Sequence, residues 1–261
     1  SFRSNSFKMV ATLDSKAWEC AQWISVKDAP VVEGVVKDGL RAADGASWFS
    51  AKLTPEKKVT KAVWMTTGLG VYNLYVNGEP IGDEFLKPGF THPYKTRRSF
   101  TYDVTASFKT AAGSENVLAV EVTPGWWGDK IVTPGGSKGM LGRKCAFRGV
   151  LELTYSDGST ELFGSDTEHW LAAIAGPTVH AAIFDGEVYD ARIPAPVMGV
   201  DGQKPEVNDE FKGEILPTDG AEIYLRRDLT LAPIKAYTWE GVKDSTEAEY
   251  GNVIVKQEFA V

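Results

Sequence analysis

TGLGVYNLYVNGEPIGD, residues 67 to 83, is the stretch of sequence that decides the fold. Tyr72, Leu74 and Val76 alternate with the residues between them, so one face of an extended strand is expected to be buried. Asn77-Gly78 follows and supplies the two positive-φ residues of a type I′ turn. The stretch therefore predicts a β-hairpin. It holds no acid, base or nucleophile placed for catalysis, so function is expected in the surrounding loops.

The composition of the chain excludes several classes of function. Of its 261 residues 24% are charged, and the formal net charge is -7, which argues against nucleic acid or an anionic membrane as partner. A neutral ligand fits this charge better. Aromatic residues make up 11% of the chain and include eight Trp, which is typical of proteins that offer flat apolar faces to ligands.

Strand-like runs follow one another closely along the chain, and each is bounded by Gly, Pro, Asn or Asp. A second hairpin turns at Asp157-Gly158, and only 106–112 looks helical, over about two turns. The pattern predicts an all-β protein with a jelly-roll-like β-sandwich. The predicted strands are 48–53, 62–67, 71–76, 98–102, 117–123, 149–155 and 159–163.

The sequence divides into four predicted segments. Residues 1–17 are a polar lead-in, and 18–192 form the sandwich. Prolines, glycines and acids with little apolar periodicity predict a linker at 193–213. The last segment, 214–261, is too short for an independent sandwich, so its strands either complete the first sheet or begin a second β domain. These additional strands are predicted at 222–225, 234–239 and 253–259.

Two cysteines, Cys20 and Cys145, predict neither a metal site nor a disulfide framework, and their pairing stays open. No run of about 18 apolar residues predicts a membrane span, and we expect that no signal peptide is retained. The chain begins at Ser1 without Met, which suits a processed export product or a trimmed chain. We expect an exported protein, periplasmic or extracellular, with a cytoplasmic location as the alternative.

Short motifs mark the chain between residues 18 and 192. They are WECAQWI (18–24), GLGVY (68–72), YVNG (75–78), GD (82–83), PGFT (88–91), YDVT (102–105), PGWW (124–127), LELTY (151–155) and DGEVYDAR (185–192). Each fragment alone is weak, but the ordered set is fairly specific. It resembles the N-terminal β-sandwich module of bacterial α-L-rhamnosidases, which are glycoside hydrolases.

The resemblance implies that hydrolysis takes place elsewhere. In this family the inverting hydrolysis of α-linked rhamnose is done by carboxylates in a later helical-barrel domain, and no segment here supplies that barrel's long amphipathic helices. The chain then resembles a non-catalytic accessory module. Such a module contacts rhamnose-containing oligosaccharide or polysaccharide, or it braces the catalytic domain of a longer chain. The alternatives are a free-standing lectin-like carbohydrate-binding protein and a purely structural β domain.

A calcium site is suggested only by the resemblance to this family. Some family members bind rhamnose and calcium through this sandwich, with an acidic-amide pair and backbone oxygens. The nearest counterpart here, Asp44-Gly45, has Gly where an amide would be needed. We therefore expect no cofactor, keep calcium as an alternative, and leave the metal ligands unknown.

The loop PGWWGDK, 124–130, is the best candidate site on physical grounds. Adjacent residues of an extended chain point in opposite directions, so one of Trp126 and Trp127 can anchor in the core while the other faces outward. Asp129 can accept hydrogen bonds from sugar hydroxyls. The alternative is that both rings pack, one in the core and one under a neighbouring loop or domain.

A second aromatic loop, 88–95, contains Tyr94, which can stack on a sugar and donate a hydrogen bond. Its alternative role is to cover the open end of the core. His92, His169 and His180 have no metal-ligand spacing and no nucleophile placed beside them. The predicted carbohydrate-binding residues are thus Trp126, Trp127, Asp129 and Tyr94, with no catalytic residue among them.

Overall fold

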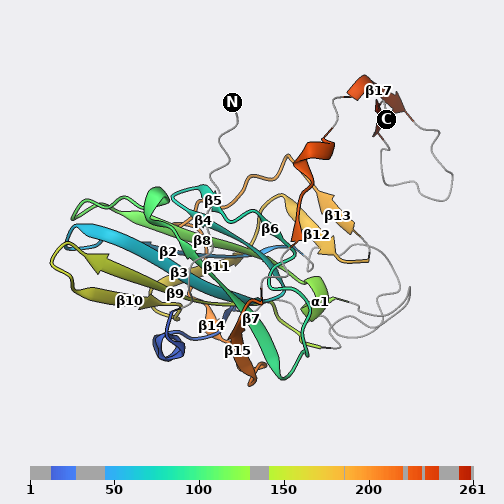
Figure 1. The fold of residues 1–261 in the computed structure, drawn as a ribbon. Coiled ribbons are helices and arrows are strands. Elements are labelled where there is room, and N and C mark those ends of the chain that lie inside the picture. The colour runs from blue at the N-terminus through green and yellow to red at the C-terminus, as the bar shows by residue number, and fades with distance from the viewer. Residues whose placement is uncertain are drawn as a thin grey trace. The chain divides into compact units, whose positions relative to one another are not determined.

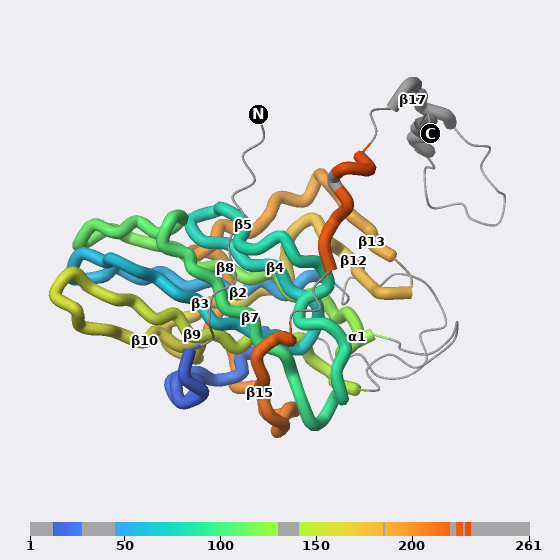
Figure 2. The backbone as a smooth tube through the Cα atoms, viewed as in Figure 1, coloured from blue at the N-terminus to red at the C-terminus, as the bar shows by residue number. Residues whose placement is uncertain are grey.

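Two compact units make up the chain in the computed structural model, Ser1–Ile223 and Tyr224–Val261, and each is described by itself. Figure 2 follows the backbone of the first unit from its blue N-terminal segment to its orange strands. The described residues are 13–27, 45–129, 141–184, 186–219 and 223–230, together with the backbone of 233–240 and 253–259.

The larger sheet of the first unit is antiparallel except at one edge (Figure 1). Among the described strands its order is β14-β1-β9-β3-β7-β15, with β10 paired to β9. Strands β3 and β9 form its centre, with Trp64 opposite Leu151. The bounds are β1 Ile24–Ser25, β3 Val59–Leu69, β7 Thr96–Asp103, β9 Ala146–Tyr155, β10 Thr160–Gly164, β14 Glu206–Val207 and β15 Glu214–Pro217.

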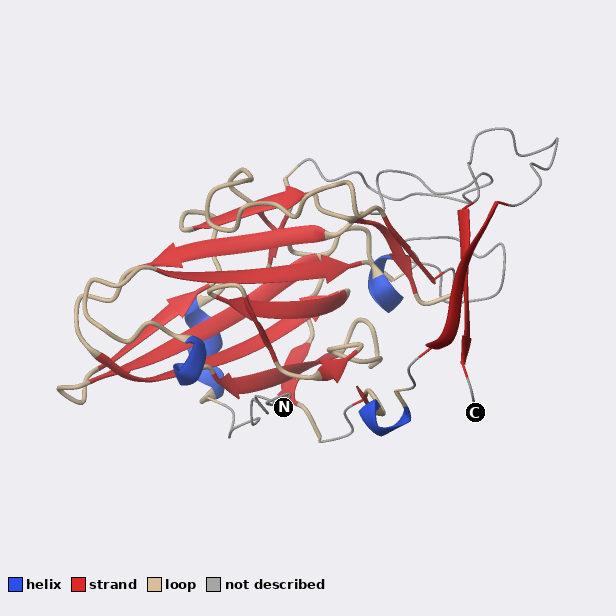
Figure 3. Cartoon of the chain, turned by 90° about the horizontal axis from the view of Figure 1, so that it is seen from above, coloured by secondary structure: helices blue, strands red, loops and turns tan. Residues whose placement is uncertain are grey.

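The smaller sheet lies against the larger one and has the order β11-β2-β8-β4-β5 among the described strands. All its pairs are antiparallel. Short elements surround the two sheets, and Figure 3 shows how little of the described chain is helical. The sheet strands are β2 Ser47–Leu53, β4 Val71–Val76, β5 Glu79–Ile81, β8 Asn116–Thr123 and β11 Trp170–Ile174. The remaining elements are β6 Glu84–Phe85, β12 Thr178–Ala182, β13 Gly186–Tyr189, β16 Ile223–Tyr224 and the helical turns η1 Ser15–Cys20, η3 Thr105–Ser107 and α1 Gly125–Gly128.

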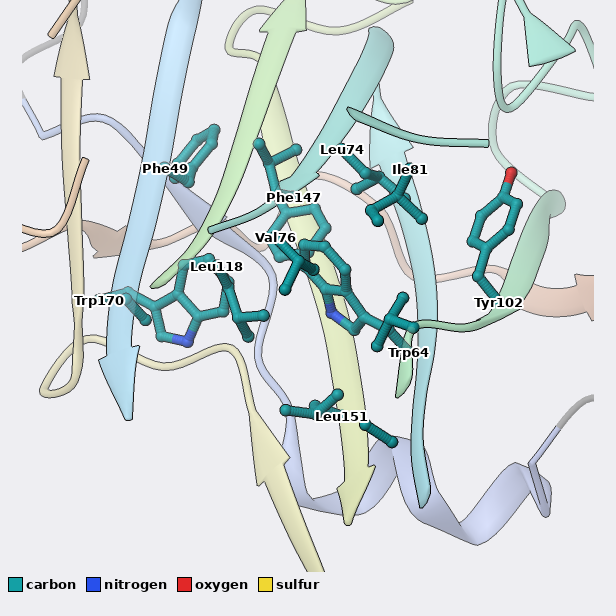
Figure 4. Close-up of a cluster of buried hydrophobic side chains, with 14 of the residues drawn as sticks. Phe49, Trp64, Leu74, Val76, Ile81, Tyr102, Leu118, Phe147, Leu151 and Trp170 are labelled. Atoms are coloured by element: carbon teal, nitrogen blue, oxygen red, sulfur yellow. The ribbon is translucent and has the colours of Figure 1, made fainter. Parts of the chain in front are cut away.

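The core fills the space between the two sheets (Figure 4). Phe49 and Leu118 come from the smaller sheet, and Trp64 and Phe147 come from the larger one, all of them fully buried. Large apolar side chains of this kind stabilise a fold by roughly 1.5–3 kcal/mol each. The predicted all-β sandwich is therefore confirmed, and its alternating strands are what bury this layer.

The predicted hairpin is confirmed in detail. Strand β4 pairs with β5 so that Val76 lies opposite Glu79 across a two-residue turn. Asn77 and Gly78 have φ of 52° and 83°, the positive values of a type I′ turn. The Asn77 side chain adds a tertiary anchor, because its Nδ2 atom donates to the Ser107 carbonyl at 2.8 Å and its Oδ1 atom accepts from the Val117 amide at 3.0 Å.

All seven predicted strands of the sandwich are present, and most are longer than predicted. The predicted helix at 106–112 is wrong, because only the three-residue turn η3 forms there. Two side chains explain this. Phe108 is buried in the core, and the Asn116 side chain bonds both the amide and the carbonyl of Lys109, which holds the following backbone out of a helix.

The chain after residue 193 contributes to both edges of the larger sheet. Strand β14 pairs antiparallel with β1, and β15 pairs in parallel with β7, with Glu214 opposite Thr96. Between these strands Phe211 is 4% exposed and packs edge-on against Trp23 at 5.8 Å. The boundaries 193–213 and 214–261 stay predictions as domain limits.

The second unit contains the turn η4 (Arg227–Leu229) and an antiparallel pair formed by β17 (Pro233–Glu240) and β18 (Val253–Phe259). Both strands agree with the predicted runs at 234–239 and 253–259. In the described part of the chain, no helix combines the length and apolar character that crossing a membrane requires. No disulfide joins Cys20 to Cys145.

We predict that Gly78→Val costs about 1–3 kcal/mol of unfolding free energy. No atom lies within 4 Å of the position of an added Cβ, so the cost comes from a β-branched residue at positive φ and not from a clash. Urea unfolding monitored by intrinsic fluorescence measures it. Gly78→Asn is the control and stays near wild type, since Asn tolerates this conformation. Equal midpoints for the Val variant and the wild type would contradict the turn's role.

Candidate functional site

The two adjacent tryptophans lie on a helical turn, and the expectation of an extended backbone is wrong. Successive side chains of such a turn diverge by about 100°, so the rings still face different surroundings. Trp127 is 3% exposed, and its indole N–H donates to the Lys144 carbonyl at 3.0 Å. Gly142 packs flat on this ring, since a Cβ there would lie 1.8 Å from it. Trp126 is half-buried and keeps part of its ring at the surface.

Trp126 meets the second aromatic loop through Phe90. The two rings are 6.2 Å apart and nearly edge to face, and Phe90 is 56% exposed. Together with Trp127 and Arg97 they line a shallow cleft of about 20 Å³ that we call the aromatic cleft. Glycines and prolines of the β3–β4 and β6–β7 connections complete its wall. The two loops identified separately in the sequence thus form one surface feature.

The structure brings only some of the predicted site residues together. Trp126 and Trp127 line the aromatic cleft, one at its surface and one in its floor. Tyr94 is 54% exposed and lies on the same loop as Phe90, but it does not line the cleft. Its ring packs against that of His92, with 6.4 Å between the ring centres. Asp129 is 2% exposed, so its carboxylate is withdrawn from the surface.

Arg97 is a cleft residue that the sequence did not reveal. Its guanidinium lies between two rings, 4.8 Å from the centre of Trp127 and 5.2 Å from that of Phe211, and it donates to Thr91 Oγ1 at 3.3 Å. Burial lowers the pKa of Arg97 to about 10, so it stays charged at neutral pH. A buried cation held between two aromatic faces fixes the floor of the cleft.

A buried ion pair supports the loop that carries Phe90. Lys87 Nζ lies 3.8 Å from Glu84 Oε2, and both side chains are 2% exposed. The hydroxyl of Tyr102 donates to the same Glu84 oxygen at 2.8 Å, and Lys87 lies over the rings of Tyr72 and Tyr102. Burial lowers the pKa of Lys87 to about 8, although the charge of Glu84 acts in the opposite direction. The backbone of Lys87 is also tied down, because its carbonyl accepts from the Tyr72 amide.

Metal ligands are not evident in the described part of the chain, where no three His, Cys, Asp or Glu side chains form a group that could hold a metal ion. Asp44, the acid of the pair considered for calcium, lies outside the described residues. His92 and His169 are exposed on different connections, and His180 is buried on β12. The chemistry that the described site offers is therefore ring stacking and hydrogen bonding.

The fold and the cleft define a β-sandwich module with an aromatic cleft at one end, and comparison with known proteins identifies the module. The family described as "Alpha-L-rhamnosidase N-terminal domain" matches residues 57–200. The α-L-rhamnosidase of Streptomyces avermitilis is 39% identical over 138 residues, which are 53% of this chain and 13% of that enzyme.

Solved structures agree with this match. The α-L-rhamnosidase from Dictyoglumus thermophilum gives a TM-score of 0.70 at 24% identity, over 87% of this chain and 25% of that one. The S. avermitilis α-L-rhamnosidase complexed with L-rhamnose gives 0.54 at 30% identity, over 74% of this chain and 18% of that one. The chain belongs to the α-L-rhamnosidase N-terminal domain family. It spans between 13% and 20% of the length of the curated relatives reported by the comparison.

The buried Lys87 gives a prediction for the pH dependence of stability. Its pKa in the folded state, about 8, lies below the usual value of 10.5, so between these values the unfolded state binds more protons. Stability from this group therefore rises as pH increases through that window, on the order of 2 kcal/mol from pH 8 to 10. Burial raises the pKa of Tyr72, which opposes the gain only above pH 10.

Lys87→Met is expected to remove this rise, and the exposed Lys58→Met serves as control and keeps it. Urea unfolding of the three proteins at pH 7, 8, 9 and 10 measures the effect. The same pH dependence of stability in the wild type and in the Lys87 variant over this range would show that the lysine is not held in a low-pKa site.

Proposed function

We propose that this chain is the non-catalytic accessory module of an α-L-rhamnosidase and that its aromatic cleft contacts rhamnose-containing carbohydrate. The observation that carries the proposal is the pair of Trp126 and Phe90, two aromatic rings at the surface above a floor of buried Trp127 and Arg97. A pyranose has an apolar C–H face that stacks on such rings and a rim of hydroxyls that needs polar partners.

The rigidity of the floor favours a binding role. Trp127 is held by the Lys144 carbonyl, Gly142 and the Arg97 guanidinium, so that the turn α1 is fixed before any ligand arrives. A site that is ordered beforehand loses less conformational entropy on binding. The solved S. avermitilis relative is described as complexed with L-rhamnose, which supports the choice of sugar to test.

Bracing of a catalytic domain is the second candidate, and one observation favours it. Phe85 at the end of β6 and Leu86 directly after it are 42% and 36% exposed and line a separate hollow beside Val71. Exposed apolar side chains of this kind are a feature of surfaces that another domain covers. We propose an exported location for the parent protein and keep calcium as a variable in the binding test.

We expect weak sugar binding that depends on Trp126. Truncating one stacking ring removes about 0.5–1.5 kcal/mol, so Trp126→Ala weakens the affinity for L-rhamnose or a rhamnose-containing oligosaccharide about threefold to tenfold. Tryptophan fluorescence and NMR shifts measure the titration, with and without calcium. Trp48→Ala is the matched control, because Trp48 is also half-buried but lies on β2, outside the cleft.

The bracing role replaces the sugar-binding one if no sugar perturbs the cleft at tens of millimolar and both tryptophans of the turn are inaccessible to a quencher. A response that survives Trp126→Ala unchanged would also contradict the proposed site. An equal loss in the Trp48 variant would mean that the effect comes from general destabilisation.

Hydrolysis by this chain alone is expected to be absent. The longest described helical segment, η1, has six residues, and no acid and base pair is placed at the aromatic cleft. The chain is mixed with an aryl α-L-rhamnoside, and the released aryl alcohol is compared with a buffer blank. Turnover above the blank that disappears when a carboxylate of this chain is mutated would overturn the assignment as a non-catalytic module.

A further inference from the structure

A second hollow lies at the other end of the sandwich. It is formed by the β2–β3 connection, the β9–β10 hairpin and the segment before β11, and we call it the end groove. In Figures 1 and 2 these connections lie at the left, whereas α1 lies at the right. The side chains that matter most in it are Lys57, Tyr155, Glu161, Phe163 and His169.

The end groove is large enough for a ligand of several rings. Its volume is about 710 Å³, whereas that of the aromatic cleft is about 20 Å³. Ligand-binding clefts fall in the range of about 300–1,000 Å³. The groove lies between the two sheets at this end, because Leu53 at the end of β2 and Leu153 of β9 both line it.

Aromatic rings form part of the wall. Phe163 packs on Trp170 at 6.3 Å and meets the imidazole of His169 at 6.0 Å. Tyr155 is 6% exposed, and Lys57 Nζ lies 5.6 Å from its ring centre. These rings are held by the core on one side, so they present fixed apolar surfaces to the groove.

The lysines of the groove are paired within the module, whereas the exposed carboxylate of Glu56, which also lines it, has no cationic partner in the described part of the chain. Lys57 Nζ binds Asp157 at 2.8 Å, and the hydroxyl of Tyr155 donates to Glu161. His169 Nδ1 lies 2.7 Å from Asp166 Oδ2, an arrangement that orients the imidazole and leaves Nε2 as the ring nitrogen open to a further hydrogen bond.

A further ion pair joins groove residue Lys52 to Glu115 at 3.2 Å. The charges narrow the class of ligand. A groove that binds an anion keeps an uncompensated positive charge, but the two lysines here are paired with acids, and the carboxylates of Glu56 and Glu161 repel an anion. What remains is a set of oriented hydrogen-bonding atoms beside apolar rings, which matches a ligand with hydroxyl groups on apolar rings.

We propose that the end groove is a second carbohydrate site, which takes a neutral oligosaccharide and is independent of the aromatic cleft. The sugar rings stack on the surface made by Phe163 and its neighbours, and the hydroxyls bond His169 and Glu161. Because the two sites lie at opposite ends of the sandwich, the module contacts a glycan chain at two separated places.

The test uses two neutral tetrasaccharides, rhamnotetraose and cellotetraose, with tetragalacturonate as the charged comparison. Each is titrated into the full chain, and backbone amide shifts are mapped by NMR. We expect a neutral tetrasaccharide to shift the amides of Thr54, Glu56 and Lys57 and those of 158–161. His169→Ala and Glu161→Ala each remove one hydrogen-bonding partner and weaken this binding about twofold to tenfold. Both residues are exposed, so the variants are expected to fold.

Two controls make the outcome specific. Glu168→Gln alters an exposed side chain next to His169 that does not line the groove, and it leaves the affinity unchanged. Trp126→Ala also leaves it unchanged, so failure of the aromatic cleft is distinguishable from failure of the end groove. The proposal is overturned if groove amides respond only to tetragalacturonate, if neutral tetrasaccharides shift none of them at the highest concentration that their solubility permits, or if both groove variants bind like the wild type.

Discussion

Contact of the two sheets through Phe147 is the interaction on which the rest of the structure depends. This ring is fully buried on β9. Its centre lies 6.2 Å from the ring centres of Phe49 on β2 and of Trp64 on β3, and 5.3 Å from that of Trp170 on β11. One side chain therefore touches both layers and the neighbouring strand of its own sheet (Figure 4). Loops at both ends of the sandwich acquire fixed positions because the strands that bear them are held apart by this aromatic layer.

Strands were predictable from the sequence because their signal is local. Alternation at Tyr72, Leu74 and Val76 and the turn at Asn77-Gly78 are both visible within a few residues, and the structure has them where they were predicted. The helix predicted at 106–112 does not form, and the reason is non-local. Its backbone is bonded by Asn116, a residue whose role depends on the approach of β8.

The candidate site was predictable only in part, because it is assembled from distant segments. Its tryptophans stood out in the sequence, but the partner rings Phe90 and Phe211 come from connections about 35 and 85 positions away. Nothing in the sequence marked Arg97 as a buried residue of the site, since an arginine on a strand is ordinarily exposed. The depth of Asp129 likewise depends on how the neighbouring loops pack, which composition and spacing do not encode.

Strands β14 and β15 occupy opposite ends of the larger sheet, and their position has a consequence for solubility. Without them, the outer sides of β1 and β7 would present unpaired backbone groups that can recruit a strand from another molecule. Both added strands are short, and β15 ends in Pro217, which has no amide hydrogen to extend the ladder. By pairing with β1 and β7, strands β14 and β15 thus reduce edge-to-edge aggregation of the sandwich that precedes them in the chain.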